Sequence, residues 1–417
     1  MSQQTGLVAP TRALRCALGA AILLAASLSR AQHVESVTVH GAKRTRIETI
    51  VGLLPRRPPA NFDDDELEDF ERRLHNLAVF DQVRVQRSGA IVLVTVREKW
   101  TLIPDLTFAT GRTSKDLSFE LGAVEFHTLG LGLQLGATIH RKQRALGFVS
   151  WLGEHPYRLY RWSRGGAIEY ANASYRFDDG HSYRLAGPRV SGWLSSPPFL
   201  SRFLRYRIDL RYQLEVVHDE SGGSAPPSGH GIVLGSSISY DRFRWHDLVP
   251  RGVKVSVGFG PGFFAPSQQP RHFLELEAKA ALPLTWQAVL AVRLKAGLVT
   301  RGNPTASYLV GSVDGVRGLA DALYRSWAQA VANIELRQAV RVLERLALQL
   351  VLFADLAQLA RMSGSGARDE RLFAASVGGG VRVLPTFVAQ AALRLDVARL
   401  LVPSPAWIPL LGVAQYF

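Results

Sequence analysis

The stretch that decides the fold lies at residues 205–216 and reads RYRIDLRYQLEV. Every second side chain in it is apolar: Tyr206, Ile208, Leu210, Tyr212, Leu214 and Val216. The side chains between them are all charged or polar: Arg205, Arg207, Asp209, Arg211, Gln213 and Glu215. Because successive side chains of a β-strand point to opposite faces, the pattern predicts a strand with one wholly apolar face. The stretch is also about as long as a tilted strand must be to cross a bilayer.

The same alternation returns many times between residues 101 and 417. Clear examples occupy residues 253–259, 274–282, 290–296 and 393–397. A soluble β-sandwich could contain one such strand, but the repetition favours an antiparallel transmembrane β-barrel. We expect about 16 strands, at about 20 residues for each strand with its connection. The last two are expected to be centred near Ala391 and Val413.

The composition and the first residues indicate an exported protein. The 417 residues include 47% hydrophobic side chains, which excludes a disordered chain. The net charge of +14 suits nucleic acid or anionic lipid as a neighbour. Two arginines precede an apolar run at residues 16–28, and small residues stand at the −3 and −1 positions of a cut after Ala31, so we predict a signal peptide over residues 1–31. An uncleaved anchor helix is the alternative, but the run is short for a membrane span. Cleavage would remove Cys16, the only cysteine.

Residues 34–99 are predicted to form a small, separate α/β domain. Alternating segments mark its strands near residues 34–41, 80–86 and 90–96. Helical spacing marks two helices between the first strand and the second, and Thr45 with Glu48 forms an expected capping box for the first helix. The acidic run at residues 63–66 suits the start of the second helix better than a metal site. The expected order is strand, helix, helix, strand, strand.

Short motifs in this domain resemble those of a POTRA domain, the periplasmic module of outer-membrane assembly and secretion barrels. They read VTVHG at residues 37–41, VFDQV at residues 79–83 and VTVRE at residues 94–98. The sequence contains one such domain, which the resemblance places at residues 34–99, ahead of a barrel at residues 101–417.

Motifs in the barrel region resemble those of the BamA/TamA superfamily of outer-membrane barrels. The loop motif consists of Gly315, Val316, Arg317, Gly318 and Leu319, and it is similar to the VRG-aromatic loop of that superfamily. The sequence FADLA at residues 353–357 resembles its F-x-D-x-G strand, and NIELR at residues 333–337 resembles the strand that follows the loop. Residues 324–356 could also be read as an amphipathic helix, but these motifs favour two strands joined near residues 341–345.

The resemblance implies roles for individual residues. It places Arg317 in a loop between strands eleven and twelve, folded into the lumen, with Asp355 on strand thirteen as its ion-pair partner beside Phe353. A buried guanidinium needs such a carboxylate, because an unpaired one costs several kcal/mol; the alternative is a hydrated Arg317 in a surface loop. Leu319 and Ala357 depart from the usual aromatic residue and glycine. Gly412 and Phe417 resemble the C-terminal membrane-insertion signal.

The sequence favours a transport or assembly function over an enzyme. It contains no nucleophile elbow, no phosphate-binding loop and no histidine spacing for a metal, so no metal or cofactor is expected. The basic excess falls on expected lumen faces and is not taken as a nucleic-acid footprint. The resemblance implies an outer-membrane barrel whose POTRA domain receives unfolded outer-membrane or secreted clients in the periplasm and whose barrel inserts or exports them. The other expected partners are the bilayer, lipopolysaccharide and periplasmic or lipoprotein accessory factors. A two-partner-secretion-like exporter of a dedicated substrate is the alternative, and a passive pore is a further one.

Overall fold

The structure is a computed structural model. It describes residues 31–109, 118–142, 145–155, 161–176, 182–220, 227–246, 249–265, 269–300, 307–312, 315–319, 324–361, 371–389 and 392–413. The predicted signal peptide, apart from Ala31, lies outside the described residues, and so do Ala391 and Phe417.

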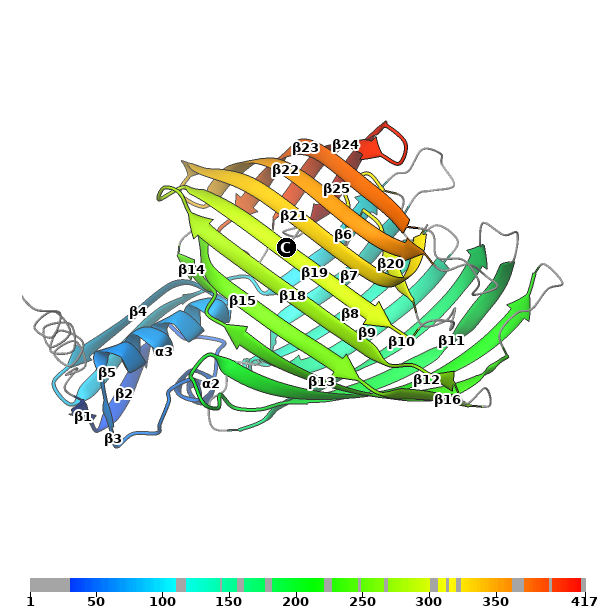
Figure 1. The fold of residues 1–417 in the computed structure, drawn as a ribbon. Coiled ribbons are helices and arrows are strands. Elements are labelled where there is room, and N and C mark those ends of the chain that lie inside the picture. Colours follow the sequence, from blue (N-terminus) through cyan, green and yellow to red (C-terminus); the bar gives the residue numbers. More distant parts are fainter. Residues whose placement is uncertain are drawn as a thin grey trace, which may run out of the picture.

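Sixteen antiparallel strands close into a barrel, which confirms the predicted fold class (Figure 1). They are β6 (Leu102–Ala109), β7 (Ser118–Thr128), β8 (Leu133–Lys142), β9 (Ala145–Glu154), β10 (Ser163–Arg176), β11 (Ser182–Ser195), β12 (Leu204–Asp219), β13 (Gly229–Asp241), β15 (Val249–Gly260), β18 (Phe273–Pro283), β19 (Ala288–Val299), β21 (Tyr324–Leu343), β22 (Leu346–Arg361), β23 (Arg371–Pro385), β24 (Leu393–Val402) and β25 (Ala406–Val413). Four short strands extend this wall: β14 (Arg244–His246), β16 (Gly262–Ala265), β17 (Gln269–Pro270) and β20 (Tyr308–Val310). The barrel closes where β25 pairs with β6.

The barrel wall has its apolar face outside, as the alternation in β12 predicts. Leu210 is 54% exposed, whereas Glu215 on the opposite face is 1% exposed. The same holds along β22, where Leu350 and Leu352 are exposed and Asp355 is fully buried. A water-soluble protein would reverse this arrangement, because exposed apolar area is unfavourable in water.

Two segments settle questions that the sequence left open. Residues 324–356 form strands β21 and β22, joined by a tight turn at Glu344 and Arg345, so the helical alternative is wrong. The strand expected around Ala391 begins later, at Leu393, where the alternation of apolar and polar side chains starts.

The first described residues form a small α/β unit of their own. Its sheet has the order β2 (Ser36–His40), β5 (Ile91–Glu98) and β4 (Phe80–Ser88), with β2 parallel to β5 and β4 antiparallel to it. Helices α2 (Ile47–Val51) and α3 (Asp64–Asn76) pack against it, and β1 (Gln32–Val34) pairs with β3 (Ala60–Phe62). Its core includes Ile50, Leu54, Phe62, Phe70, Leu74 and Val92, and Phe126 of the barrel strand β7 packs against it. No helix in the described part of the chain is long and apolar enough to cross a membrane.

The two helix starts differ from each other and correct one expectation. The acidic run opens α3 as predicted, and Asp63 and Glu66 form a reciprocal capping box there. The capping box expected from Thr45 and Glu48 is wrong, because α2 begins at Ile47 and has no side-chain cap. The Thr45 hydroxyl instead donates to the Glu98 carboxylate at 2.7 Å.

Glu98, at the end of β5, holds the segment that leads into α2. Its carboxylate accepts hydrogen bonds from the backbone N–H groups of Lys43, Arg44 and Thr45 at 3.2, 3.0 and 2.7 Å. Burial by itself raises the pKa of the Glu98 carboxyl, but these bonds and the Thr45 hydroxyl outweigh it and lower the pKa below the ordinary 4.5. The ionised form of Glu98 therefore stabilises the folded domain.

We expect Glu98→Gln to lower the unfolding free energy of this unit by about 1–2 kcal/mol at neutral pH. Because the folded pKa is depressed, the contribution of Glu98 is present above pH 4.5 and is lost as the pH falls through the folded pKa. Hydrogen exchange of residues 43–49 in the full chain, measured from pH 7 downward, reports it. Glu35→Gln, at an exposed position, is the matched control, and an equal effect of both changes would contradict the role of Glu98.

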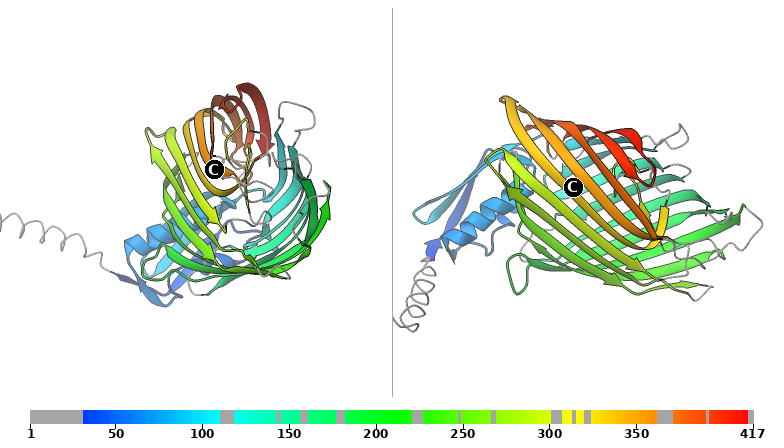
Figure 2. Two further views of the ribbon diagram at one scale, coloured as in Figure 1. Left: turned by 45° about the vertical axis from the view of Figure 1, so that its right-hand side comes forward. Right: turned by 45° about the horizontal axis from the view of Figure 1, so that its top comes forward.

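The small unit is fixed to one end of the barrel (Figure 2). On the α3 side, the Asn76 amide donates to the carbonyl of Phe243 at 2.8 Å, and Glu68 pairs with Arg244 at 2.9 Å. On the α2 side, the Thr49 hydroxyl donates to the carbonyl of Gly130 at 2.9 Å. Phe243 and Gly130 lie in the turns after β13 and β7, and Arg244 begins β14, so the unit covers part of the end where those turns lie.

Candidate functional site in the barrel lumen

The loop motif lies inside the barrel between β19 and β21, the eleventh and twelfth of its sixteen strands. Arg317 is fully buried there. The Ser312 hydroxyl folds the loop, since it accepts from the N–H of Gly318 at 2.9 Å and donates to the carbonyl of Leu319 at 2.8 Å. Gly318 has φ +90°, a conformation that favours glycine because it lacks a Cβ.

The structure brings Arg317 to Asp355 on β22, the thirteenth strand. Nε and Nη2 of Arg317 donate to the two carboxylate oxygens of Asp355 at 2.7 and 2.8 Å, and its backbone N–H donates at 3.1 Å. The guanidinium also stacks on the ring of Phe353, 3.5 Å from the ring centre. Such a two-pronged pair with a stacked ring fixes both the position and the plane of the guanidinium.

Arg317 has two further carboxylates within reach that the sequence reasoning did not assign to it. Glu335 on β21 accepts from Nη1 at 2.6 Å, and Asp396 on β24 lies 3.5 Å from the same atom. Glu335 also pairs with Arg337 at 2.6 Å and with Arg382 on β23 at 2.9 Å. Three arginines and three carboxylates thus form one buried cluster that ties the loop to four strands. The NIELR motif contained Glu335 and Arg337, but its spacing does not show which strands lie opposite.

Two glycines on the lumen face of β23 make room for this cluster. A Cβ on Gly380 would lie 2.0 Å from Oδ1 of Asp396, and a Cβ on Gly378 would lie 2.4 Å from the ring of Phe353. The neighbouring lumen positions Ser376 and Arg382 take part in the cluster through Asp355 and Glu335. Glycine is therefore required at these two positions of β23, because a larger side chain would collide with Phe353 and Asp396.

The apolar side chains of the loop form a core of their own inside the barrel. Val316 and Leu319 pack with residues of the surrounding strands: Val310, Val331, Ala357, Leu359, Ala374 and Leu400. Leu319 and Ala357, the two positions that differ from the motifs this sequence resembles, lie in this one cluster and are 2% exposed.

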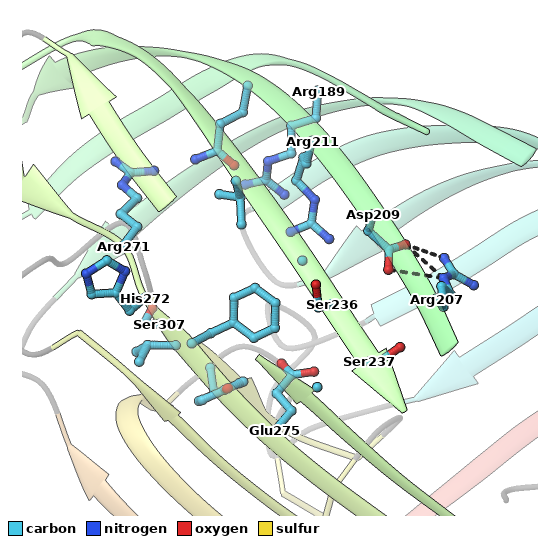
Figure 3. A pocket seen from close by; sticks show the side chains of 17 residues that line it. Arg189, Arg207, Asp209, Arg211, Ser236, Ser237, Arg271, His272, Glu275 and Ser307 are labelled. Carbon is cyan, nitrogen blue, oxygen red and sulfur yellow. Dashed lines mark hydrogen bonds and ion pairs between the residues drawn. The ribbon is translucent and has the colours of Figure 1, made fainter. Parts of the chain in front are cut away.

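The opposite wall of the lumen is open and charged. A cavity of about 460 Å³ there is lined mainly by residues of β11 to β13 and by the segment that leads into β18, among them Arg189, Arg207, Asp209, Arg211, Arg271 and Glu275 (Figure 3). Most of the charge is paired locally, since Arg207 binds Asp209 at 2.6 Å and Arg189 binds Glu169 at 3.1 Å. No group of His, Cys, Asp and Glu in the described part of the chain could hold a metal ion.

Gly412 lies where the barrel closes. It is paired with Thr107 of β6, next to the pairs Leu411–Phe108 and Leu410–Ala109. These three pairs are the part of the seam within the described residues, since residues 110–117 and 414–417 lie outside them. The other residue of the predicted insertion signal, Phe417, lies outside the described residues.

Solved structures with a similar fold are bacterial barrels. CdiB from Escherichia coli superposes with a TM-score of 0.65 and 12% identity, over 92% of this chain and 76% of that chain. BamA from Haemophilus ducreyi lacking POTRA domains 1–3 superposes with a TM-score of 0.51 and 14% identity, over 92% and 84%. This chain shares the fold of the BamA and CdiB barrels.

A second CdiB barrel agrees with this result. CdiB from Acinetobacter baumannii superposes with a TM-score of 0.63 and 11% identity, over 92% of this chain and 74% of that chain. No family model and no curated protein matches the sequence. A match over 92% of the chain reaches beyond the barrel into the small α/β unit.

Proposed function

We propose that this protein is a non-enzymatic outer-membrane barrel that takes an unfolded polypeptide from its small domain and inserts it into the membrane. The observation that carries the proposal is the sheet of the small domain, in which β2 and β4 each pair on one side only, with β5. Each therefore presents one row of backbone N–H and C=O groups to the surroundings among the described residues. An extended client strand can add to such a row.

The free sheet edges are better suited to binding many different clients than to recognising one specific client. Backbone hydrogen bonds read the extended shape of a client and not its side chains, so binding at an edge is largely indifferent to sequence. The domain is attached to the barrel through Asn76, Glu68 and Thr49, so a client bound at an edge would be held near the barrel end. This is the role that the resemblance to a POTRA domain implies, with the domain in the periplasm.

The location follows from the barrel's surface. The outward face of β12 and its neighbours is apolar, so a bilayer is its natural surroundings. We assign it to the bacterial outer membrane, in contact with phospholipid and lipopolysaccharide. We propose periplasmic or lipoprotein accessory factors as further partners of the barrel.

Two features of the barrel favour different routes for the client. The seam lies between the first and last strands of the barrel, β6 and β25, which are not joined by a turn, and this suits lateral insertion of a client strand into the membrane. The charged cavity of about 460 Å³ in the lumen suits export of a dedicated secreted substrate instead, and this is the second candidate. A passive pore needs neither free sheet edges nor a small domain fixed to the barrel, so it explains less of the molecule.

The proposal is tested by proline substitution in β4. Successive N–H groups of a strand point to opposite edges, so one of Arg84→Pro and Val85→Pro removes a bond to β5 and the other removes a donor from the free edge. The variant that keeps its bonds to β5 should have a small domain as resistant to proteolysis as that of the unchanged chain. We expect this same variant, which has lost a donor at the free edge, to fail in inserting clients. The readout is insertion of a urea-unfolded eight-stranded outer-membrane barrel into liposomes that contain the full-length variant, measured by its faster migration on unheated gels.

The control is removal of the whole domain. Deletion of residues 34–98 should leave a barrel that still migrates as a folded species but no longer inserts the probe. A truncated barrel that inserts the probe at the normal rate would show that the domain is not a receptor. That result would remove the main support for the proposed function.

A further inference from the structure

A second cavity lies where the small domain meets the barrel. Its volume is about 390 Å³, and it is lined by Arg46, Glu48, Thr49 and Arg57 from the α2 region and by Leu131 and Arg161 from the barrel. Three guanidinium groups face one carboxylate there, so the lining is positively charged. The two parts are held together by the bond from the Arg46 N–H to the Gly130 carbonyl at 3.1 Å.

The strand register places this cavity below the outer, apolar face of the barrel. Arg161 pairs with Glu154 at 3.0 Å, and Glu154 lies opposite Leu133 in the β8–β9 ladder. Two residues further along both strands, Leu135 and Leu152 lie opposite each other and are 44% and 48% exposed. Because residues two apart share a face, Glu154 and Arg161 mark the end of the surface that would contact acyl chains.

The residues next to the cavity are of the types found at a membrane–water interface. Trp162 directly follows Arg161 and is exposed, and tryptophan is enriched at the headgroup level of membrane proteins. Leu129, two residues before the lining residue Leu131, is 75% exposed in the left-handed conformation with φ +54°. The left-handed backbone conformation is strained for a leucine. Its exposed apolar side chain is unfavourable in water, whereas contact with acyl chains would remove that side chain from water.

Arg46 supplies a charge that the chain itself does not use. Among the described residues, no ion pair or hydrogen bond involves its guanidinium, whereas Arg161 is already bound to Glu154. An incoming phosphate could accept hydrogen bonds from the Arg46 guanidinium, while Arg57 and Arg161 add positive charge to the cavity. Guanidinium groups bind phosphate oxygens with strong, charge-assisted hydrogen bonds.

We propose that this cavity binds the phosphate of a phospholipid headgroup from the adjacent leaflet, with the acyl chains along Leu133, Leu135 and Leu152. The inference rests on the proposed membrane location of the barrel and adds a site to it. The bound lipid would join α2 to the barrel wall and so fix the small domain against the membrane surface. A free phosphate ion shares the recognised chemistry but lacks the acyl chains.

The test uses the full-length protein in nanodiscs that contain phosphatidylglycerol, followed by native mass spectrometry of the lipid retained after release. The variant is the triple change Arg46→Gln, Arg57→Gln and Arg161→Gln. The control removes the same charge from exposed arginines at the same barrel end: Arg164→Gln, Arg341→Gln and Arg345→Gln. We expect the occupancy of retained lipid to fall about tenfold in the variant and to stay unchanged in the control.

Two results would overturn the proposal. One is equal retention of lipid by the variant and the control. The other is release of the lipid by excess inorganic phosphate, which would make the cavity a site for free anions. Failure of the proposed membrane location is seen separately, because the unchanged protein would then not enter nanodiscs as a folded, heat-modifiable species.

Discussion

Replacing Arg317 with alanine is expected to lower the unfolding free energy of the barrel by about 3–5 kcal/mol. The change would leave the Asp355 carboxylate buried without its two-pronged partner, and Asp396 would lose the nearby charge at 3.5 Å. Glu335 would keep Arg337 and Arg382. The cost therefore arises mainly from stranded negative charge on β22 and β24. The backbone N–H at position 317 can still donate to Asp355, but the side-chain bonds from the loop to both strands would be lost.

The temperature at which the folded band disappears from unheated gels measures this loss. Arg207→Ala is the matched control, because Arg207 also pairs with an aspartate in the lumen but both side chains are 35–44% exposed. Exposed pairs contribute about 0–1 kcal/mol, so the control should unfold near the temperature of the unchanged protein. Equal shifts for the two alanine variants would contradict the view that the Arg317 cluster is dry.

A double-mutant cycle separates the pair from the rest of the cluster. Asp355→Asn alone leaves Arg317 with Glu335, and the combination with Arg317→Met removes both charges of the pair. We expect the double variant to be more stable than the sum of the two single changes indicates, because neither charge is then left without its partner. Purely additive effects would show that Arg317 and Asp355 do not act together.

Locking the seam of the barrel is expected to abolish insertion of the unfolded probe barrel. Phe108 and Leu411 lie directly opposite each other on β6 and β25, and both side chains face outward. Phe108→Cys with Leu411→Cys, in a chain that also carries Cys16→Ser, places two thiols at positions where a disulfide can form with small adjustments. Oxidation would then prevent the three seam pairs from opening, and reduction should restore insertion.

The control joins two strands that do not need to part. Leu121 and Ile139 lie opposite each other on β7 and β8, also on the outer face, and a turn already connects these strands. Leu121→Cys with Ile139→Cys should leave insertion unchanged in either redox state. If the oxidised seam variant inserts the probe normally, lateral insertion is wrong, and export through the charged lumen becomes the better proposal.

The barrel could be predicted because its pattern is local. A residue's place on the inner or outer face follows from its parity along the strand, and Leu210 and Glu215 show the two sides of that alternation in β12. The alternation does not show where a strand begins when small residues weaken the difference between its apolar and its polar face. The strand expected near Ala391 therefore begins only at Leu393.

The candidate site could be predicted only in part. Arg317, Asp355 and Phe353 were found through motif resemblance, and the structure brings the three together. Glu335 and Asp396 were not assigned to Arg317, because their proximity depends on the registers of three strand pairs and on a loop folding inward. Register is set by the whole ladder, so the spacing of residues along one strand does not reveal it.

By itself the sequence determined the sixteen-stranded wall, its apolar outer face and the small α/β unit before it, since each follows from periodicities of two or 3.6 residues. Only the tertiary structure decided which groups meet across those elements. Thr45, spaced from Glu48 as a helix cap, gives its hydroxyl to Glu98 more than fifty residues away, because that carboxylate also accepts the neighbouring backbone N–H groups. Gly380 lies where a Cβ would collide with Asp396. The physical reason is the same in both cases: a polar group binds the partner that folding brings close, and distance along the chain does not measure that closeness.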